Sequence, residues 1–253
     1  MDEAKAGSEQ GYRVQSGNNM PIQAPLIPDP FVPYHCPHNA NLMVVCRTDK
    51  AVLEKYLAPT PFEAIDDRYV VYASDFSRCD KTPFMDTGII VPVRWGKRTG
   101  GYFLFEYENN DSAIAAGRDL WGYPKKYAEI LFEESEAAVR SRTVRKGETI
   151  MELRCNLTRP AEFEPVVTTP HLNIHIQPGP DGRILNKRII ERDTSPDFAL
   201  ESECKAMAEV SLRGLSSDPL HELQPQEVLG ASFVVGHFHA TEENGWGRTV
   251  VEL

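Results

Sequence analysis

Two adjacent lysines, Lys125 and Lys126, follow Pro124 in a segment rich in aromatic residues, and their chemistry depends on how deeply they are buried. An ordinary lysine has a pKa near 10.4, so only about 0.04% of it is neutral at pH 7. Full burial in apolar surroundings lowers a lysine pKa by roughly 3 to 5. A neutral lysine amine attacks carbonyl carbons and forms a Schiff base. The segment therefore predicts a Schiff-base enzyme if Lys125 is buried, and two surface lysines at the start of a strand if it is not.

The two lysines are not expected to share one site. Successive side chains of a strand point to opposite faces, so Lys126 does not automatically lie beside Lys125. We therefore expect desolvation, rather than a second cation, to be the main cause of a lowered Lys125 pKa. The rest of the chain would then build a closed, apolar pocket around Lys125.

Strand patterns dominate the elements that must position this pocket. One short helix is expected within 109–120, capped by Asp111 or Ser112, and another follows a cap at Thr48 or Asp49 and ends before Pro59. The strands are expected at 41–47, 69–76, 89–95, 102–108, 125–133, 136–145, 149–157, 171–177, 183–193, 206–213 and 227–239, while 201–209 is ambiguous. The strand at 89–95 contains Pro92, which predicts an edge or bulged strand.

Consecutive strands with few helices between them predict the fold class. They favour a mainly β, α+β domain with antiparallel strands over a doubly wound sheet. The N-terminal segment 1–38 is polar and then proline-rich, with six prolines within 21–37, which predicts a flexible arm lying over the domain or over a neighbouring subunit. The remaining residues, 39–253, are expected to form a single domain.

Composition excludes several classes of protein. The chain has 253 residues and a net charge of −10, which makes a nucleic-acid partner unexpected because phosphate binding needs a basic face. No segment approaches the roughly 20 apolar residues of a membrane span. The five cysteines are scattered without a paired motif, so we expect reduced thiols and a cytoplasmic protein.

A longer stretch around the lysines resembles a known family. The run from Ala115 to Lys126, AAGRDLWGYPKK, is similar to the signature of the acetoacetate decarboxylase family. Weaker similarities occur in matching order at Arg47-Thr48-Asp49, at Val91-Pro92-Val93 and at the turn 178–182. The resemblance implies a closed, barrel-like sheet around an apolar pocket, a small keto acid as substrate, no metal or organic cofactor, and assembly into a homo-oligomer.

The resemblance also implies roles for individual residues. It assigns the Schiff base to Lys125, a supporting catalytic role to Lys126, and the acidic pocket residue to Asp86. The implied reaction is decarboxylation of a β-keto acid: the amine condenses with the ketone, and the iminium accepts the electrons of the broken carbon–carbon bond. Such a lysine acts by nucleophilic catalysis, with a desolvated amine as the nucleophile.

Several positions depart from the family pattern and leave the substrate open. Asn39 and Ala40 stand where the decarboxylases carry an arginine and a glutamate, and Tyr72 stands near the place of a second glutamate. Asp86 is shorter than the glutamate of the family, and Glu106 replaces an apolar residue. Glu106 could be an added pocket acid or could face solvent. Two aromatic residues could line the pocket or pack in the core: Trp121 and Tyr123.

Three functions remain compatible with these residues. The first is a Schiff-base decarboxylase of a β-keto acid. The second is a Schiff-base aldolase-dehydratase or cyclase acting on a larger oxo acid. The third is a non-catalytic small-molecule-binding relative. Retention of the Pro-Lys-Lys sequence argues against the third, and the absence of the arginine–glutamate pair argues against a simple copy of the first.

Overall fold

The computed structural model describes residues 19–28 and 30–253, so most of the polar N-terminal segment lies outside the described residues. The first half contains β1 (Tyr34–Arg47), α1 (Lys50–Leu57), β2 (Glu63–Ala64), β3 (Arg68–Phe76), β4 (Phe84–Trp95), β5 (Arg98–Glu108), α2 (Asp111–Trp121) and β6 (Lys125–Tyr127). The second half contains β7 (Glu129–Glu134), β8 (Ala138–Arg145), β9 (Glu148–Pro160), β10 (His171–Pro178), β11 (Ile184–Arg192), β12 (Phe198–Leu212), β13 (Glu227–Ala240) and β14 (Arg248–Glu252). The fold is therefore mainly β, as predicted, and the ambiguous segment 201–209 belongs to a strand.

All fourteen strands of the described residues belong to one sheet. Hydrogen-bonded neighbours follow the order β14-β11-β10-β5-β4-β3-β1-β13-β12-β9-β8-β7, with β2 attached to β4 and β6 attached to β5. Most pairs are antiparallel, but β5 pairs in parallel with both β6 and β10. The path is open, because β14 and β7 stand at its two ends. The pairing thus does not show the closed, barrel-like sheet that the resemblance implied.

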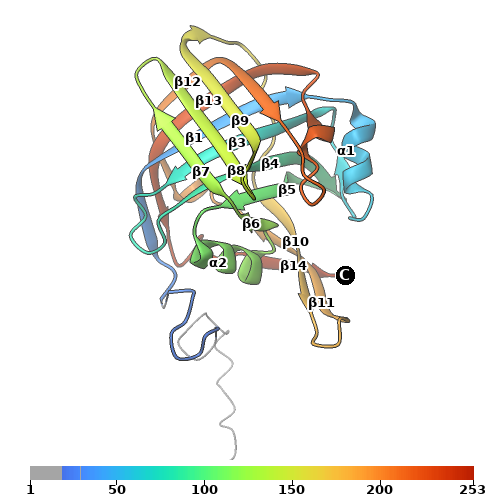
Figure 1. Cartoon of the computed structure of the whole chain (residues 1–253). Coiled ribbons are helices and arrows are strands. Elements are labelled where there is room, and N and C mark those ends of the chain that lie inside the picture. Colours follow the sequence, from blue (N-terminus) through green and yellow to red (C-terminus); the bar gives the residue numbers. More distant parts are fainter. Residues whose placement is uncertain (1–18, 29) are drawn as a thin grey trace, which may run out of the picture.

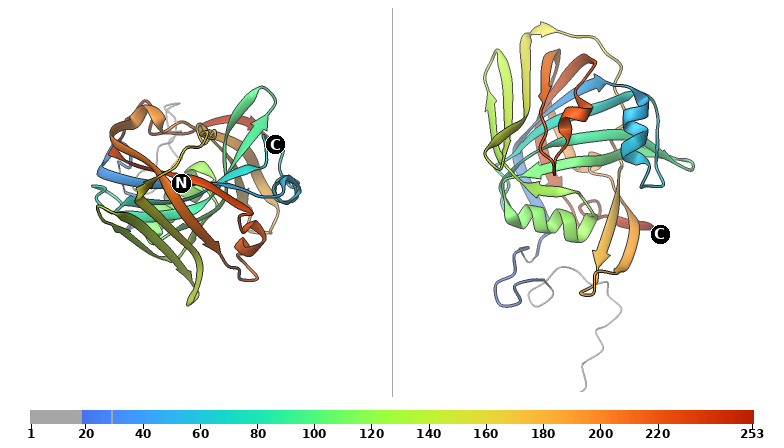
Figure 2. Two further views of the ribbon diagram at one scale, coloured as in Figure 1. Left: turned by 90° about the horizontal axis from the view of Figure 1, so that it is seen from above. Right: turned by 45° about the vertical axis from the view of Figure 1, so that its right-hand side comes forward.

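The sheet nevertheless curves strongly and encloses its own core. In Figure 1 the strands β7, β8, β9 and β12 cross in front of β3, β4 and β5, and Figure 2 shows the same curvature from two further sides. β7 contacts both β3 and β4, and the hydroxyls of Thr87 on β4 and Thr143 on β8 are hydrogen-bonded at 2.8 Å. One apolar cluster fills the space between these two layers, and a second lies toward α2.

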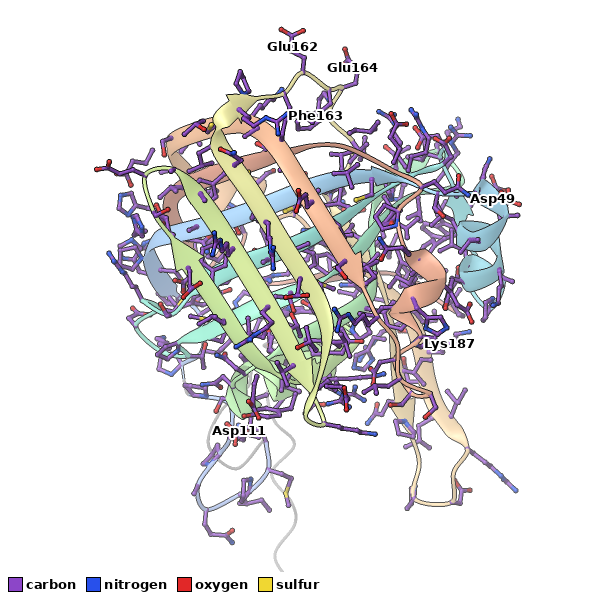
Figure 3. The ribbon with its side chains drawn as sticks, turned by 45° about the horizontal axis from the view of Figure 1, so that its top comes forward. Asp49, Asp111, Glu162, Phe163, Glu164 and Lys187 are labelled. Carbon is purple, nitrogen blue, oxygen red and sulfur yellow. A yellow bond between two sulfur atoms is a disulfide. The ribbon has the colours of Figure 1, made fainter. Side chains whose placement is uncertain are left out.

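The helix α2 lies across one end of the sheet, directly before the lysine pair (Figure 1). Asn110, rather than the expected Asp111 or Ser112, is the N-cap, since its side chain accepts a hydrogen bond from the Ala113 amide at 3.1 Å. Gly122 ends the helix with a φ of 70°, a left-handed conformation that favours glycine. Figure 3 shows Asp111 at the start of α2 and Asp49 at the start of α1, where Asp49 is the N-cap as expected.

The proline-rich segment contributes to the folded domain more than we expected. The strand β1 begins at Tyr34, which pairs with Ala240 of β13, although the arm was expected to extend to residue 38. Pro37 is tolerated because the pairing of β1 with β13 shifts register between Cys36 and Asn39. Upstream of β1, Phe31 is buried in the cluster next to α2.

Two further expectations need correction. Pro92 lies in β4, which has neighbours on both sides, so the strand is not at an edge. The register shift between Ile89 and Ile90 leaves its extra residue, Leu104, on β5, so β4 is not the bulged strand either. The expected strand 125–133 is two strands, β6 and β7, separated at Ala128. In both cases the hydrophobic pattern indicated a strand, but the partners were set by distant parts of the chain.

The cysteines are not all reduced. Cys36 and Cys79 form a disulfide between β1 and the loop after β3, while Cys46, Cys155 and Cys204 are free. The expectation of five reduced thiols was therefore wrong for two of them, which removes one argument for a cytoplasmic location. No helix among the described residues has the length and apolar character needed to span a membrane.

Candidate active site

A cavity of about 380 Å³ opens between the curved sheet and α2. Most of the residues that the sequence analysis singled out line it: Asn39, Tyr72, Asp86, Glu106, Trp121, Tyr123 and Lys125. Aromatic side chains such as Phe76, Phe103 and Phe238 supply much of the remaining wall. Its size is within the range of pockets that bind small organic ligands.

Lys125 lines this cavity and is buried, with 7% of its surface exposed. It is the first residue of β6, which pairs in parallel with β5 so that Lys125 stands beside Glu106. The side chain passes closely over α2 at Gly117, where an added Cβ would lie 2.2 Å from the Lys125 Cε. The ammonium also lies 5.2 Å from the ring centre of Tyr123 and 5.4 Å from that of Phe84. Helix, strand and aromatic wall together fix its direction.

Three buried carboxyl groups surround the Lys125 ammonium. Glu106 and Glu108 lie two residues apart on β5 and therefore point to the same face. The ammonium donates a hydrogen bond to Glu108 and lies 3.3 Å from Glu106 Oε1. The third acid is Asp86 on β4, which accepts a hydrogen bond from the Tyr72 hydroxyl at 2.9 Å. The oxygens of the three acids lie within 4.8 Å of one another.

These acids reverse the expected effect of burial on Lys125. Burial lowers the Lys125 pKa, but the negative charges of Glu106, Glu108 and Asp86 and the hydrogen bond to Glu108 raise it by more. The pKa therefore lies above its ordinary value, and the resting side chain is an ammonium. The expectation of a desolvated, neutral lysine was correct about burial and wrong about the net direction of the pKa.

Burial has the opposite effect on the carboxyl groups. Desolvation raises the pKa of Glu108 to about 8, although the Lys125 charge partly offsets it. Desolvation likewise raises the pKa values of Asp86 and Glu106, whose carboxyl oxygens lie within 4.8 Å of each other. Two oxygens, Glu106 Oε2 and Glu108 Oε2, have no hydrogen-bond partner among the described residues. Ionising all three of these close, buried acids would place like charges together, so the raised pKa values favour keeping a proton within the cluster.

The raised Glu108 pKa predicts a pH-dependent stability. Between about pH 4.5 and pH 8 the folded state holds a Glu108 proton that the unfolded state has lost, so the free energy of unfolding falls as pH rises. We expect Glu108→Gln to remove on the order of 3 kcal/mol of this change. Urea unfolding at several pH values from about 5 to about 8.5 measures it. Identical pH slopes for the two proteins would contradict the assignment.

The acid cluster is also where a cation could bind. Asp86, Glu106 and Glu108 are the one group of three potential metal ligands that converges within the described part of the chain. The Lys125 ammonium already lies against two of these carboxylates. The Lys125 ammonium therefore occupies the position between the carboxylates that a bound metal ion would take.

Lys126 points away from this cavity. Its ammonium donates to Asp218 Oδ1 at 2.7 Å and to the Ser217 carbonyl oxygen at 2.8 Å. Arg145 contacts the other oxygen of Asp218, and the pKa of Asp218 is lowered to about 2, because its hydrogen bonds outweigh burial. Lys126 therefore holds β6 to the loop after β12, on the opposite face of the strand from Lys125.

Three residues of the site were missed by sequence reasoning. Glu108 could have been found, since it follows Glu106 by two residues on an expected strand. Arg192 and His171, which lie in the cavity wall far along the chain, gave no local signal. Burial and the nearby Arg192 lower the pKa of His171 to about 3, so its ring is neutral and hydrogen-bonds the Tyr123 hydroxyl at 2.6 Å.

Comparison with protein families and curated sequences gives one consistent result. The family model described as acetoacetate decarboxylase (ADC) matches residues 19–246. The acetoacetate decarboxylase of Acidiphilium cryptum is 29% identical over 226 residues, covering 85% of this chain and 89% of the relative. Acetoacetate decarboxylase 3 of Mesorhizobium japonicum is 31% identical over 243 residues, covering 91% of this chain and 89% of the relative.

Solved structures with the same fold are more distant in sequence. An acetoacetate decarboxylase structure matches with a TM-score of 0.81 at 18% identity, over 92% of this chain and 95% of that chain. The decarboxylase of Legionella pneumophila matches with a TM-score of 0.77 at 19% identity, over 87% and 88%. The enduracididine biosynthesis enzyme MppR, complexed with a condensation product of pyruvate and imidazole 4-carboxaldehyde, matches with a TM-score of 0.70 at 17% identity, over 94% and 98%. These likenesses establish the fold.

Proposed function

The chain belongs to the acetoacetate decarboxylase family, and from this premise we propose that it is a cofactor-independent lyase that decarboxylates a β-keto acid through a Schiff base on Lys125. One observation carries the proposal. Lys125 is buried in the wall of a cavity of about 380 Å³, and its ammonium is hydrogen-bonded to a carboxyl group whose pKa is raised. The lysine thus has both a carbonyl-sized space beside it and a group that can take its proton.

Glu108 supplies the activation that desolvation alone does not. In molecules whose Glu108 is ionised, a proton moves from the Lys125 ammonium to the Glu108 carboxylate along their hydrogen bond, which converts a buried ion pair into two neutral groups. Filling the cavity with substrate favours this transfer, because excluding water penalises the charged pair more than the neutral one. The amine is then a nucleophile although its resting pKa is high.

The remaining steps need one acid and one electron sink. The Lys125 amine adds to the ketone carbon and passes one of its protons to the new oxygen, which gives a carbinolamine. A second proton, held by the Asp86–Glu106 pair, goes to that hydroxyl, which leaves as water and yields the iminium. The carbon–carbon bond to the carboxylate then breaks, its electron pair neutralises the iminium, and carbon dioxide departs. The resulting enamine takes a proton at carbon, and water hydrolyses the iminium to free the ketone and Lys125. Asp86 and Glu106 act here as general acid and base.

A second function has specific support. Asn39 lines the cavity where the family resemblance expected an arginine, and Glu106 adds an acid beside the lysine where the resemblance expected an apolar residue. Additional acids suit the proton transfers of aldol condensation and dehydration, which proceed through the same iminium. MppR, which shares the fold, has been captured with a condensation product. The alternative is therefore a Schiff-base aldolase-dehydratase acting on a larger oxo acid.

Borohydride trapping with a panel of keto acids tests the Schiff base directly. We expect a reduced adduct on the peptide that contains Lys125, located by mass spectrometry, and no adduct at Lys126, because Lys126 lies on the opposite strand face against Asp218. Release of carbon dioxide from the trapped substrates supports decarboxylation, whereas condensation products without gas release support the alternative. If no member of the panel forms an adduct, both functions are excluded.

A further inference from the structure

Arg192 is a buried cation without an acidic partner in the described structure. It is the last residue of β11, it lines the cavity, and 7% of its surface is exposed. Its Nη2 donates to the Tyr34 hydroxyl at 2.9 Å, and its guanidinium carbon lies 3.9 Å from the ring centre of Trp121. Tyr123 lies near it in the same cavity wall. None of these neighbours is a carboxylate.

The lack of a counter-ion distinguishes Arg192 from the charged residue before it. Glu191 pairs with Arg98 at 2.7 Å and also with Arg248. No described carboxylate lies within ion-pair distance of Arg192, and its Nε has no hydrogen-bond partner. Burying an unpaired charge is strongly unfavourable. Such an arrangement is stable and useful when an anionic ligand completes it, and a guanidinium is suited to hold a carboxylate through two hydrogen bonds.

The cavity therefore has two chemically different ends. At one end Lys125 lies among three acids, and at the other Arg192 presents an uncompensated positive charge. Tyr123 lies between them: the Lys125 ammonium is 5.2 Å from its ring centre, and on the other side its ring is 6.3 Å from that of Trp121, against which Arg192 packs. His171 adds no charge between them, because it is neutral. A ligand that contacts both ends must span the Tyr123 ring.

This arrangement decides which carboxylate Arg192 would bind. The carboxylate that a decarboxylase removes must become neutral carbon dioxide, so a strong ion pair to it would stabilise the substrate more than the transition state and slow the reaction. A cation at a distance from Lys125 is instead suited to a carboxylate that the substrate retains. The aromatic wall between the two ends suits an apolar chain joining the ketone to that second carboxylate.

We propose that Arg192, with Tyr34 and Trp121 around it, is the anchor for a second, retained carboxylate, so that the substrate is an oxo acid whose ketone reaches Lys125 while a distal carboxylate binds Arg192. The inference rests on the proposed Schiff-base function for the role of Lys125. It makes the substrate a ketone with two anionic groups, one lost and one retained, rather than a four-carbon β-keto acid.

A pair of ligands that cannot decarboxylate tests the anchor separately from the reaction. 5-Oxohexanoate carries a ketone and a distal carboxylate, and 2-hexanone is the matched ketone without the carboxylate. By calorimetry, we expect the unmodified protein to bind 5-oxohexanoate about 10- to 100-fold more tightly than 2-hexanone. This difference in affinity is what charge-assisted hydrogen bonds between Arg192 and the carboxylate would contribute. Arg192→Met should remove this preference and Arg192→Lys should retain part of it. Equal affinities for the two ligands in the unmodified protein would overturn the proposal without any variant having to fold.

Turnover then separates this inference from the proposed function. 3-Oxohexanedioate and 3-oxohexanoate have the same chain length and the same labile carboxylate, but only the first has a distal carboxylate. We expect the ratio of their kcat/KM values to favour the diacid by at least about tenfold and to approach one in Arg192→Met. Decarboxylation of both at equal kcat/KM would leave the Schiff-base function standing and refute the anchor. Arg192-dependent binding of 5-oxohexanoate without decarboxylation of either acid would support the anchor and refute decarboxylation.

Discussion

Replacement of Lys125 with arginine is expected to lower turnover by at least about 10⁴-fold, because loss of a covalent nucleophile removes the reaction path itself. Arginine keeps a positive charge opposite Glu106 and Glu108, so the buried acids retain a counter-ion. Its guanidinium remains protonated at any accessible pH and cannot form the iminium. Carbon dioxide release and borohydride trapping, measured with the same keto acid, check both consequences.

A second substitution tests whether the loss of turnover in Lys125→Arg is caused by the larger side chain instead of the missing amine. Arginine is longer than lysine, and Lys125 already passes closely over Gly117. Lys125→Met has a similar length and no charge, so the three acids would retain protons instead of pairing with an ammonium. Both variants should lose turnover while near-ultraviolet circular dichroism remains that of the folded protein. Activity within tenfold of the unmodified enzyme in either variant would refute the Schiff-base mechanism.

Sequence reasoning could find Lys125 because its signal is local. The lysine pair, the preceding proline and the short helix lie within one continuous stretch, and alternation along a strand correctly placed Lys126 on the other face, against Asp218. The mainly β character was equally accessible, since each strand has its own hydrophobic pattern. The open path of the sheet and the neighbours of β4 were not accessible, because they depend on pairings between distant segments.

The electrostatics of the site could not be predicted in the same way. The pKa of Lys125 is decided by the balance between burial and three negative charges, and that balance depends on which acids share its cavity. Asp86 and Glu108 are brought together by the register of β4 with β5, in which they are direct partners. Arg192 enters from β11, far along the chain from Lys125, and no short motif connects them. The protonation state of Lys125 therefore depends on which acids the fold brings next to it, whereas the lysine itself can be recognised from the local sequence motif.

Gly117→Ala is expected to lower turnover by about 100-fold or more while leaving the protein folded. Alanine in a helix is favoured over glycine by roughly 1 kcal/mol, so α2 itself gains stability. The new Cβ, however, would lie 2.2 Å from the Lys125 Cε and 2.4 Å from its Cδ. These atoms belong to a flexible side chain, which moves before the backbone does, so Lys125 leaves its position against Glu108. A displacement of about 1 Å at a reacting group is sufficient for a loss of this size.

The matched control lies on the exposed face of the same helix. Asp119→Ala also introduces an alanine into α2, but Asp119 is exposed and does not line the cavity. We expect it to retain nearly full activity, which would separate the position of Lys125 from any general effect on the helix. Borohydride trapping adds a direct readout, since adduct formation in Gly117→Ala should fall together with turnover. If Gly117→Ala kept more than half of the activity, the close passage of Lys125 over Gly117 would not be what directs the amine toward Glu108 and the substrate.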